Sequence, residues 1–185
     1  MDATTAIARR VTPAKVLAVL VALLVALAFV PGNAYAASKT VKTQGFTTTA
    51  KVVNKKATTV KAGTTKLTYK SGQGYIKFKA TKTKVYSFTF SNVKGKGTNN
   101  VYASFYRISK YSKKYIEGLT VKTKGGKDET LWLSANGYKF TGDYYTALDK
   151  PIATRTGKVK LTKGQMVYIY LNGGGGKTTA TLKIK

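Results

Sequence analysis

The amino-acid sequence predicts an all-β protein, an antiparallel β-sandwich of the jelly-roll type with about eight to ten strands. Apolar and polar residues alternate with a period of two along several stretches, most clearly in the closing residues 156–185. Turn-forming Gly and Asn residues recur at spacings of roughly 8–12 residues. No stretch after residue 36 has a sustained helical period. Core positions that alternate with polar ones favour two packed sheets over a barrel.

The first 36 residues have the pattern of a helical secretory signal peptide. Basic residues, the last of them Lys15, precede an uncharged apolar run from Val16 to Val30. The tripeptide Ala34-Tyr35-Ala36 places small residues where a signal peptidase reads them, which predicts cleavage before Ala37. An apolar run of about 15 residues is shorter than the roughly 20 that a spanning helix needs, so a retained membrane anchor is the weaker alternative.

Residues 37–56 are predicted to be a linker or an edge strand ahead of a β-sandwich domain at residues 57–185. The stretch is rich in Thr, Lys, Ala and Val, and short strands fit residues 46–53 and 58–61. The 149 residues that follow the signal suffice for one domain with a core of its own. Because the chain has no cysteine, packing and hydrogen bonds alone must hold that core.

The first half of the domain is predicted to contain strands at residues 66–70, 75–80 and 85–91. The third of these places Tyr86, Phe88 and Phe90 on one face, so these three residues are predicted to lie in the core. Residues 93–100, which contain two glycines and two asparagines, are predicted to form a loop.

The second half is predicted to contain strands at residues 101–108, 115–122 and 131–133, and then the alternating segments of residues 156–185. Residues 131–133 include Trp132, the only tryptophan of the chain. Residues 166–171 are apolar or aromatic throughout, which predicts a strand that is buried on both faces.

Three segments resemble motifs of bacterial pre-peptidase C-terminal domains. Residues 74–80 (GYIKFKA) and 84–90 (KVYSFTF) look like the hairpin of those domains, and residues 161–169 (LTKGQMVYI) are similar to the signature before their last strands. The resemblance covers about Ala57 to Lys185. It implies a jelly-roll-like accessory module of the kind appended to secreted enzymes and adhesins. Where those domains often carry acidic residues, some of them calcium ligands, this chain has Ser71, Gly72 and Gln73.

The residue types that are missing exclude much chemistry. Without histidine or cysteine, the chain has no His- or Cys-based nucleophile system and no ordinary zinc site. The glycines at 173–176 lead into a predicted strand and not into a helix, so they do not form a phosphate-binding P-loop. Asp128 or Glu129 could pair with Asp143 across a sugar, but all three lie in predicted solvated loops. We therefore expect no catalytic residues, no cofactor and no metal.

The net charge is the most unusual feature of the composition. The formal charge is +27 for the full sequence and +25 after residue 36, because the signal contributes three basic residues and one acidic one. Such a charge attracts polyanions. Only Arg107 and Arg155 follow residue 36, so nearly all of this charge is lysine. Lysine is a hydrated point charge without the forked geometry of arginine, which favours diffuse attraction over specific readout.

The strongest candidate for a ligand-binding site is the segment YRISKYSKKY at residues 106–115, in which rings alternate with cations. Rings can stack on sugars or bases while cations meet anionic groups. The alternative is a solvated lysine bend with its two end tyrosines in the core. Lysines at outward strand positions add to the candidate surface, although lysines there also deter edge-to-edge aggregation. The predicted ligand-binding residues are Tyr106, Arg107, Lys110, Tyr111, Lys113, Lys114, Tyr115, Lys77 and Lys79.

These observations predict a secreted, non-catalytic module that adheres to anionic polymers such as teichoic acid, acidic glycans or extracellular DNA. We expect it to be released, or held non-covalently at the envelope of a Gram-positive bacterium, with no membrane span after cleavage. Nucleic acid would be bound without sequence preference. The alternative is a structural or adhesin-like surface module that binds a neutral glycan or a protein. A third interpretation, a cationic antimicrobial protein, rests on charge alone.

Overall fold

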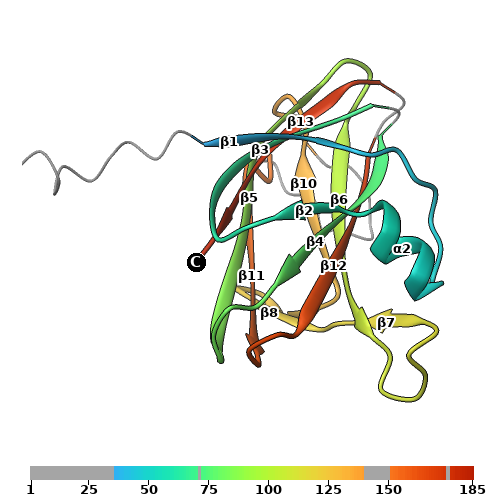
Figure 1. Cartoon of the computed structure of the whole chain (residues 1–185). Coiled ribbons are helices and arrows are strands. Elements are labelled where there is room, and N and C mark those ends of the chain that lie inside the picture. Colours follow the sequence, from blue (N-terminus) through green and yellow to red (C-terminus); the bar gives the residue numbers. More distant parts are fainter. Residues whose placement is uncertain (1–35, 71, 140–150, 174–175) are drawn as a thin grey trace, which may run out of the picture. The chain divides into compact units, whose positions relative to one another are not determined.

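The computed structural model describes residues 36–70, 72–139, 151–173 and 176–185. The expected signal peptide lies outside these residues except for Ala36, and so do Asp143 and Asp149. Within the described residues the chain is mostly β-strand with one short helix, and two sheets pack face to face as the predicted sandwich (Figure 1).

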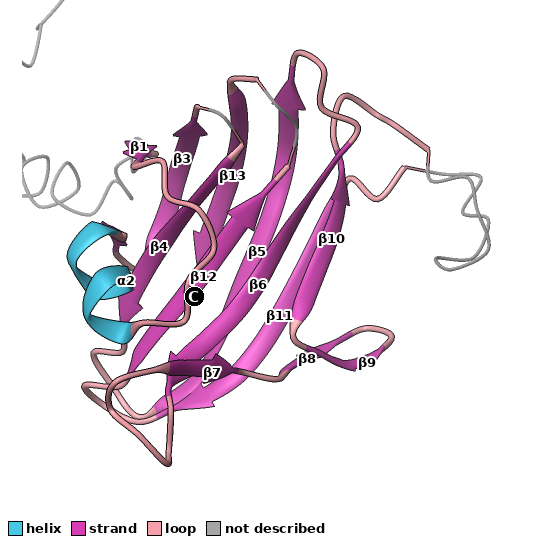
Figure 2. Cartoon of the chain, turned by 90° about the vertical axis from the view of Figure 1, so that its right-hand side faces the viewer, coloured by secondary structure: helices cyan, strands magenta, loops and turns pink. Residues whose placement is uncertain are grey.

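Sheet A has seven strands in the described residues, in the order β1-β3-β13-β5-β11-β8-β9. Its strands are β1 (Ala37–Val41), β3 (Gly63–Tyr69), β5 (Lys84–Gly95), β8 (Val121–Thr123), β9 (Gly126–Asp128), β11 (Thr154–Leu161) and β13 (Thr178–Ile184). The β8–β9 hairpin and β1 therefore form opposite edges of this sheet (Figure 2).

Sheet B has six strands in the described residues, five of them in the order β10-β6-β12-β4-β2, with β7 paired to β6. Its strands are β2 (Thr58–Val60), β4 (Gln73–Lys79), β6 (Asn100–Ile108), β7 (Ile116–Gly118), β10 (Thr130–Ser134) and β12 (Met166–Asn172). Most neighbours run antiparallel, as predicted, but the edge pairs β1/β3 and β2/β4 are parallel.

The main core fills the space between the two sheets. Tyr86, Phe88 and Phe90 of β5 are buried, as the alternation predicts. Edge-to-face ring contacts carry the packing from one sheet to the other: Phe78 of β4 lies 5.5 Å from Phe88, and Phe88 lies 5.5 Å from Phe105 of β6, measured between ring centroids. Burial of apolar surface of this kind is the main favourable contribution to folding.

A crossover segment (residues 42–57) covers part of the outer face of sheet B. The chain leaves β1 in sheet A, passes β4 at Gly74 and forms helix α2 (Ala50–Lys56) before β2. A Cβ on Gly74 would lie 2.5 Å from the carbonyl oxygen of Lys42, so only glycine permits this close passage. Figure 2 shows α2 lying against the outside of the sheet.

A second buried cluster forms beneath the crossover segment. It consists of Ala50, Val53, Ala57, Tyr75, Ile116, Tyr168 and Tyr170. Tyr75 donates a hydrogen bond of 2.8 Å from its hydroxyl to the carbonyl oxygen of Thr47. Residues 167–171 are therefore buried on both sides, as predicted, with Val167, Ile169 and Leu171 in the main core, and Met166 is partly buried.

Three predicted elements differ from the structure. The strand expected at residues 46–53 is replaced by the approach to α2, whose buried Ala50 and Val53 lie one turn apart. The loop expected at 93–100 begins later, since β5 continues to Gly95 past Asn92, which has a φ of 52°. The single strand expected at 115–122 is divided between β7 in sheet B and β8 in sheet A.

Candidate functional site

The predicted ligand-binding segment forms a hairpin at one end of sheet B. Residues 106–108 of β6 pair antiparallel with residues 116–118 of β7, so Arg107 lies directly opposite Glu117. The connection, residues 109–115, forms the tip of the hairpin. The structure thus brings together seven of the nine predicted residues on one element.

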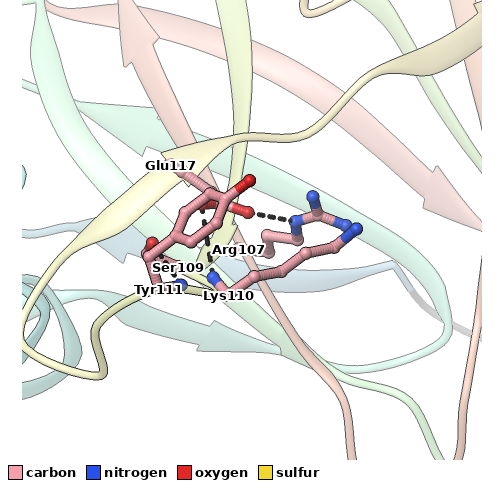
Figure 3. Close-up of polar contacts among 5 residues, drawn as sticks. All are labelled: Arg107, Ser109, Lys110, Tyr111 and Glu117. Atoms are coloured by element: carbon pink, nitrogen blue, oxygen red, sulfur yellow. Dashed lines mark hydrogen bonds and ion pairs between the residues drawn. The ribbon is translucent and has the colours of Figure 1, made fainter.

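An ion pair organises the base of this hairpin (Figure 3). The Nε–H of Arg107 donates to Oε1 of Glu117 at 2.9 Å, and the backbone N–H of Lys110 donates to Oε2 at 3.3 Å. A hydrogen bond from the Ser109 hydroxyl, with those from Arg107 and Lys110, lowers the pKa of Glu117. Arg107 is therefore already paired with a carboxylate of the protein, which makes it a weaker candidate for binding an anionic ligand.

The tip of the hairpin is held by the crossover segment. The backbone N–H of Ala50 donates to the carbonyl oxygen of Lys114 at 2.9 Å, and that of Ile116 donates to the carbonyl oxygen of Thr48 at 2.8 Å. The side chains of Lys110, Lys113 and Lys114 are exposed. The tip is thus a lysine-bearing loop with a hydrogen-bonded frame.

The three tyrosines of the hairpin have different surroundings. Tyr111 is 96% exposed and Tyr115 is 51% exposed, so both rings are available to a ligand. Tyr106 is half-buried and packs with Phe46 at 6.0 Å and Tyr75 at 6.4 Å, measured between ring centroids. Burial, as the largest contribution, raises the pKa of Tyr106.

The two remaining predicted residues lie on β4, apart from the hairpin tip. Lys77 is half-buried, and its Nζ donates to the backbone oxygen of Asn54 at 2.6 Å and to Oδ1 of Asn54 at 3.2 Å. These bonds hold Lys77 against the end of α2. Lys79 is exposed.

The outer face of sheet A carries a second, larger basic surface, here called the basic face. Ser and Thr side chains share the outward positions of its strands with exposed lysines. The lysines are Lys66 of β3, Lys94 of β5, Lys122 of β8, Lys127 of β9, Lys158 and Lys160 of β11, and Lys183 of β13. The alternation of residues 156–185 indicated outward positions for Lys158, Lys160 and Lys183. It gave no indication that Lys122 and Lys127 would join them, because that depends on pairing between distant segments.

The described carboxylates do little to neutralise this charge. Glu117 pairs with Arg107, and that is the only ion pair within the described residues. Asp128 accepts a hydrogen bond of 2.9 Å from the backbone N–H of Thr130, and the carboxylate of Glu129 lies over Gly118. No group of three or more acidic, histidine or cysteine side chains is placed to hold a metal ion in the part of the chain that the structure describes.

In residues 36–185, leaving out the undescribed gaps, no helix is long and apolar enough to span a membrane. The chain matches no protein-family model. No curated protein sequence matches it either.

Three solved structures are similar to the chain. CorA, a surface-associated copper-binding protein of Methylomicrobium album BG8, is 5% identical with a TM-score of 0.43, over 70% of this chain and 98% of that chain. The pre-peptidase C-terminal domain of a collagenase from Bacillus anthracis is 11% identical with a TM-score of 0.38, over 70% and 94%. The SPBc2 prophage-derived protein YomS is 9% identical with a TM-score of 0.37, over 65% and 92%. The second of these belongs to the family that the three sequence segments resemble.

Proposed function

We propose that this chain is an exported, non-catalytic β-sandwich module that adheres to anionic polymers through its exposed lysines. The polymers that this chemistry fits are cell-wall teichoic acid, acidic glycans and extracellular DNA. The N-terminal sequence pattern supports export, and the absence of histidine and cysteine from the sequence supports a binding role over a catalytic one.

The observation that carries this proposal is the state of the lysines. No lysine within the described residues forms an ion pair, and seven of them share the basic face. Unpaired cations on one surface raise a positive potential there, which concentrates polyanions and speeds their association. Because lysine makes few geometry-specific contacts, the attraction would depend on charge density more than on polymer sequence.

Retention on heparin or on purified cell wall at physiological salt tests this function. We expect retention at about 0.15 M salt and release at higher salt. The logarithm of the binding constant should fall linearly with the logarithm of the salt concentration, because binding releases counterions. Neutral dextran on the same support is the control. A chain that passes freely through the charged resins would refute the proposal.

The exposed rings near the hairpin favour a second candidate, the binding of a neutral glycan. Tyr111 and Tyr115 are exposed, and Phe46 is 56% exposed where it packs on Tyr106. Rings of this kind can stack on sugars without any charge. Binding of uncharged sugars on a glycan array that persists in high salt would favour this candidate over the first.

A further inference from the structure

Three lysines on the basic face lie directly opposite one another across neighbouring strands. Lys158 of β11 is the register partner of Lys122 of β8, and Lys122 is the register partner of Lys127 of β9. All three side chains are exposed. Like charges directly opposite in a sheet are destabilising. This row is therefore a place where an anion would relieve a repulsion that the free protein carries.

A groove of about 560 Å³ lies beside this row. Its lining residues are Lys122, Thr123, Lys124, Thr154, Arg155, Thr156 and Lys158. Four of these residues are cationic, the other three carry hydroxyls, and none is acidic. Ammonium, guanidinium and hydroxyl groups are all donors that an oxyanion accepts.

Arg155 adds a positive charge to the lining of the groove, but its side chain leaves β11 on the core side of sheet A, like that of its register partner Phe90. The Nε of Arg155 is buried and has no hydrogen-bond partner within the described residues. The other arginine of the sandwich, Arg107, has its Nε paired with Glu117. A buried donor without an acceptor costs free energy. Because this Nε is buried, an anion in the groove does not reach it, and Arg155 contributes to binding through its charge alone.

We propose that this groove binds a phosphate group of a linear phosphate-bearing polymer. The proposal rests on the adhesive function given above and assigns it a specific site. The four cationic residues of the lining carry more positive charge than a single carboxylate would balance. A phosphate, in contrast, offers several acceptor oxygens to several donors at once. The ammonium groups of the lining lysines can donate to these oxygens as point charges. The remaining lysines of the basic face would then attract the flanking parts of the polymer.

The test compares two double variants with equal loss of charge. Lys122→Gln with Lys158→Gln neutralises the groove, and Lys51→Gln with Lys55→Gln removes two exposed lysines from α2. Titration calorimetry with long-chain polyphosphate at physiological salt is the readout. We expect the groove variant to lose about tenfold or more in affinity, as for lost charged hydrogen bonds, and the α2 variant to lose only about twofold to threefold.

A second measurement does not depend on the titration. Because Lys122 and Lys158 repel each other, the groove variant should melt at the same temperature as the unmodified chain or higher, in low salt without polymer. Polyphosphate should raise the melting temperature of the unmodified chain more than that of the groove variant.

The outcomes separate the two proposals. If the unmodified chain binds polyphosphate and both double variants weaken equally, the groove assignment is wrong while diffuse adhesion stands. If the unmodified chain binds neither polyphosphate, dextran sulfate nor polygalacturonate, both proposals are wrong. If the groove variant loses dextran sulfate or polygalacturonate as strongly as polyphosphate, the assignment of phosphate is wrong.

Discussion

Gly157→Ala should disturb the junction between β8 and β11 that shapes the groove. Gly157 lies on β11, and a Cβ at this position would be 2.8 Å from Cγ2 and 3.1 Å from Cβ of Val121 on β8. Val121 is fully buried and β-branched, so it cannot readily rotate away. Carbon atoms pack best at about 3.5–4.0 Å, so the two strands would have to separate locally by about 0.7 Å or more.

Two opposing contributions set the size of the effect. Overpacking a filled core costs about 1–3 kcal/mol. Against this, alanine restricts the unfolded chain and returns about 0.4–1 kcal/mol, because the φ of Gly157 is not positive. We therefore expect a net loss of about 1–2 kcal/mol in the free energy of unfolding, or a melting temperature lower by roughly 2–8 °C.

Equilibrium urea unfolding followed by the fluorescence of Trp132 measures this loss. Gly125→Ala is the matched control, since a Cβ there would meet nothing within 4 Å in the turn between β8 and β9. The control should be neutral or slightly stabilising. Equal unfolding midpoints for the two variants would show that β8 does not pack closely on β11, and the groove geometry would fail with it.

Further variants test the buried tyrosines and the hairpin. Tyr69→Phe should leave the free energy of unfolding in urea unchanged or raise it by about 1 kcal/mol, because the buried hydroxyl of Tyr69 has no hydrogen-bond partner within the described residues. Tyr75→Phe should lower the free energy of unfolding by about 0.5–1.5 kcal/mol, because it loses the hydrogen bond to Thr47. Burial raises the pKa of Tyr75 to about 12, so the unfolded chain loses this proton at lower pH than the folded chain, and stability should fall as pH rises from about 10 towards 12. This alkaline loss of stability should be less steep in Tyr75→Phe. Identical alkaline unfolding profiles for the variant and the unmodified chain would contradict the assignment. Glu117→Gln should speed hydrogen exchange at the amide of Lys110 at neutral pH, with β12 amides as the control. Acidification should likewise speed exchange at this amide in the unmodified chain. The pKa of Glu117 is lowered, so the stabilisation that its carboxylate gives the loop is present at neutral pH and is lost as pH falls through that pKa. An amide that exchanges at the same rate in the variant, in the unmodified chain and at low pH would show that the carboxylate does not hold the loop.

The parts of the fold that were predictable from the sequence are those governed by local alternation. Tyr86, Phe88 and Phe90 face the core because a strand places every second side chain on one face. The helix α2 was missed because seven residues with Ala50 and Val53 on one side give too short a periodic signal, and such a helix is stabilised by the sheet beneath it. The extension of β5 was missed because Asn92 reads as a turn residue, although the strand continues beyond it.

The candidate site also has a part that local sequence predicts and a part that depends on pairing between distant segments. Residues 106–115 are contiguous, so their alternating rings and cations are visible in the sequence, but the pairing of Arg107 with Glu117 depends on how the hairpin closes. The groove was not predictable, because it joins Lys122 to Lys158 from segments far apart in the chain. Gly157 also gives no sequence signal, since its importance lies in the side chain that packs against it.

The crossover segment has a consequence for proteolysis. Residues 42–49 are the single covalent link between the edge strand of sheet A and the helix that covers part of sheet B, and Phe46 in the middle of this link is exposed. A protease that cuts here would leave β1 held by its pairing with β3 and by the hydrogen bond from the Thr58 hydroxyl to the carbonyl oxygen of Thr40, and would loosen the cover above Tyr170. Losing β1 would then uncover the backbone edge of β3, and exposed strand edges invite chains to associate. We therefore expect digestion at this one link to promote association of the chain with itself through the edge of β3.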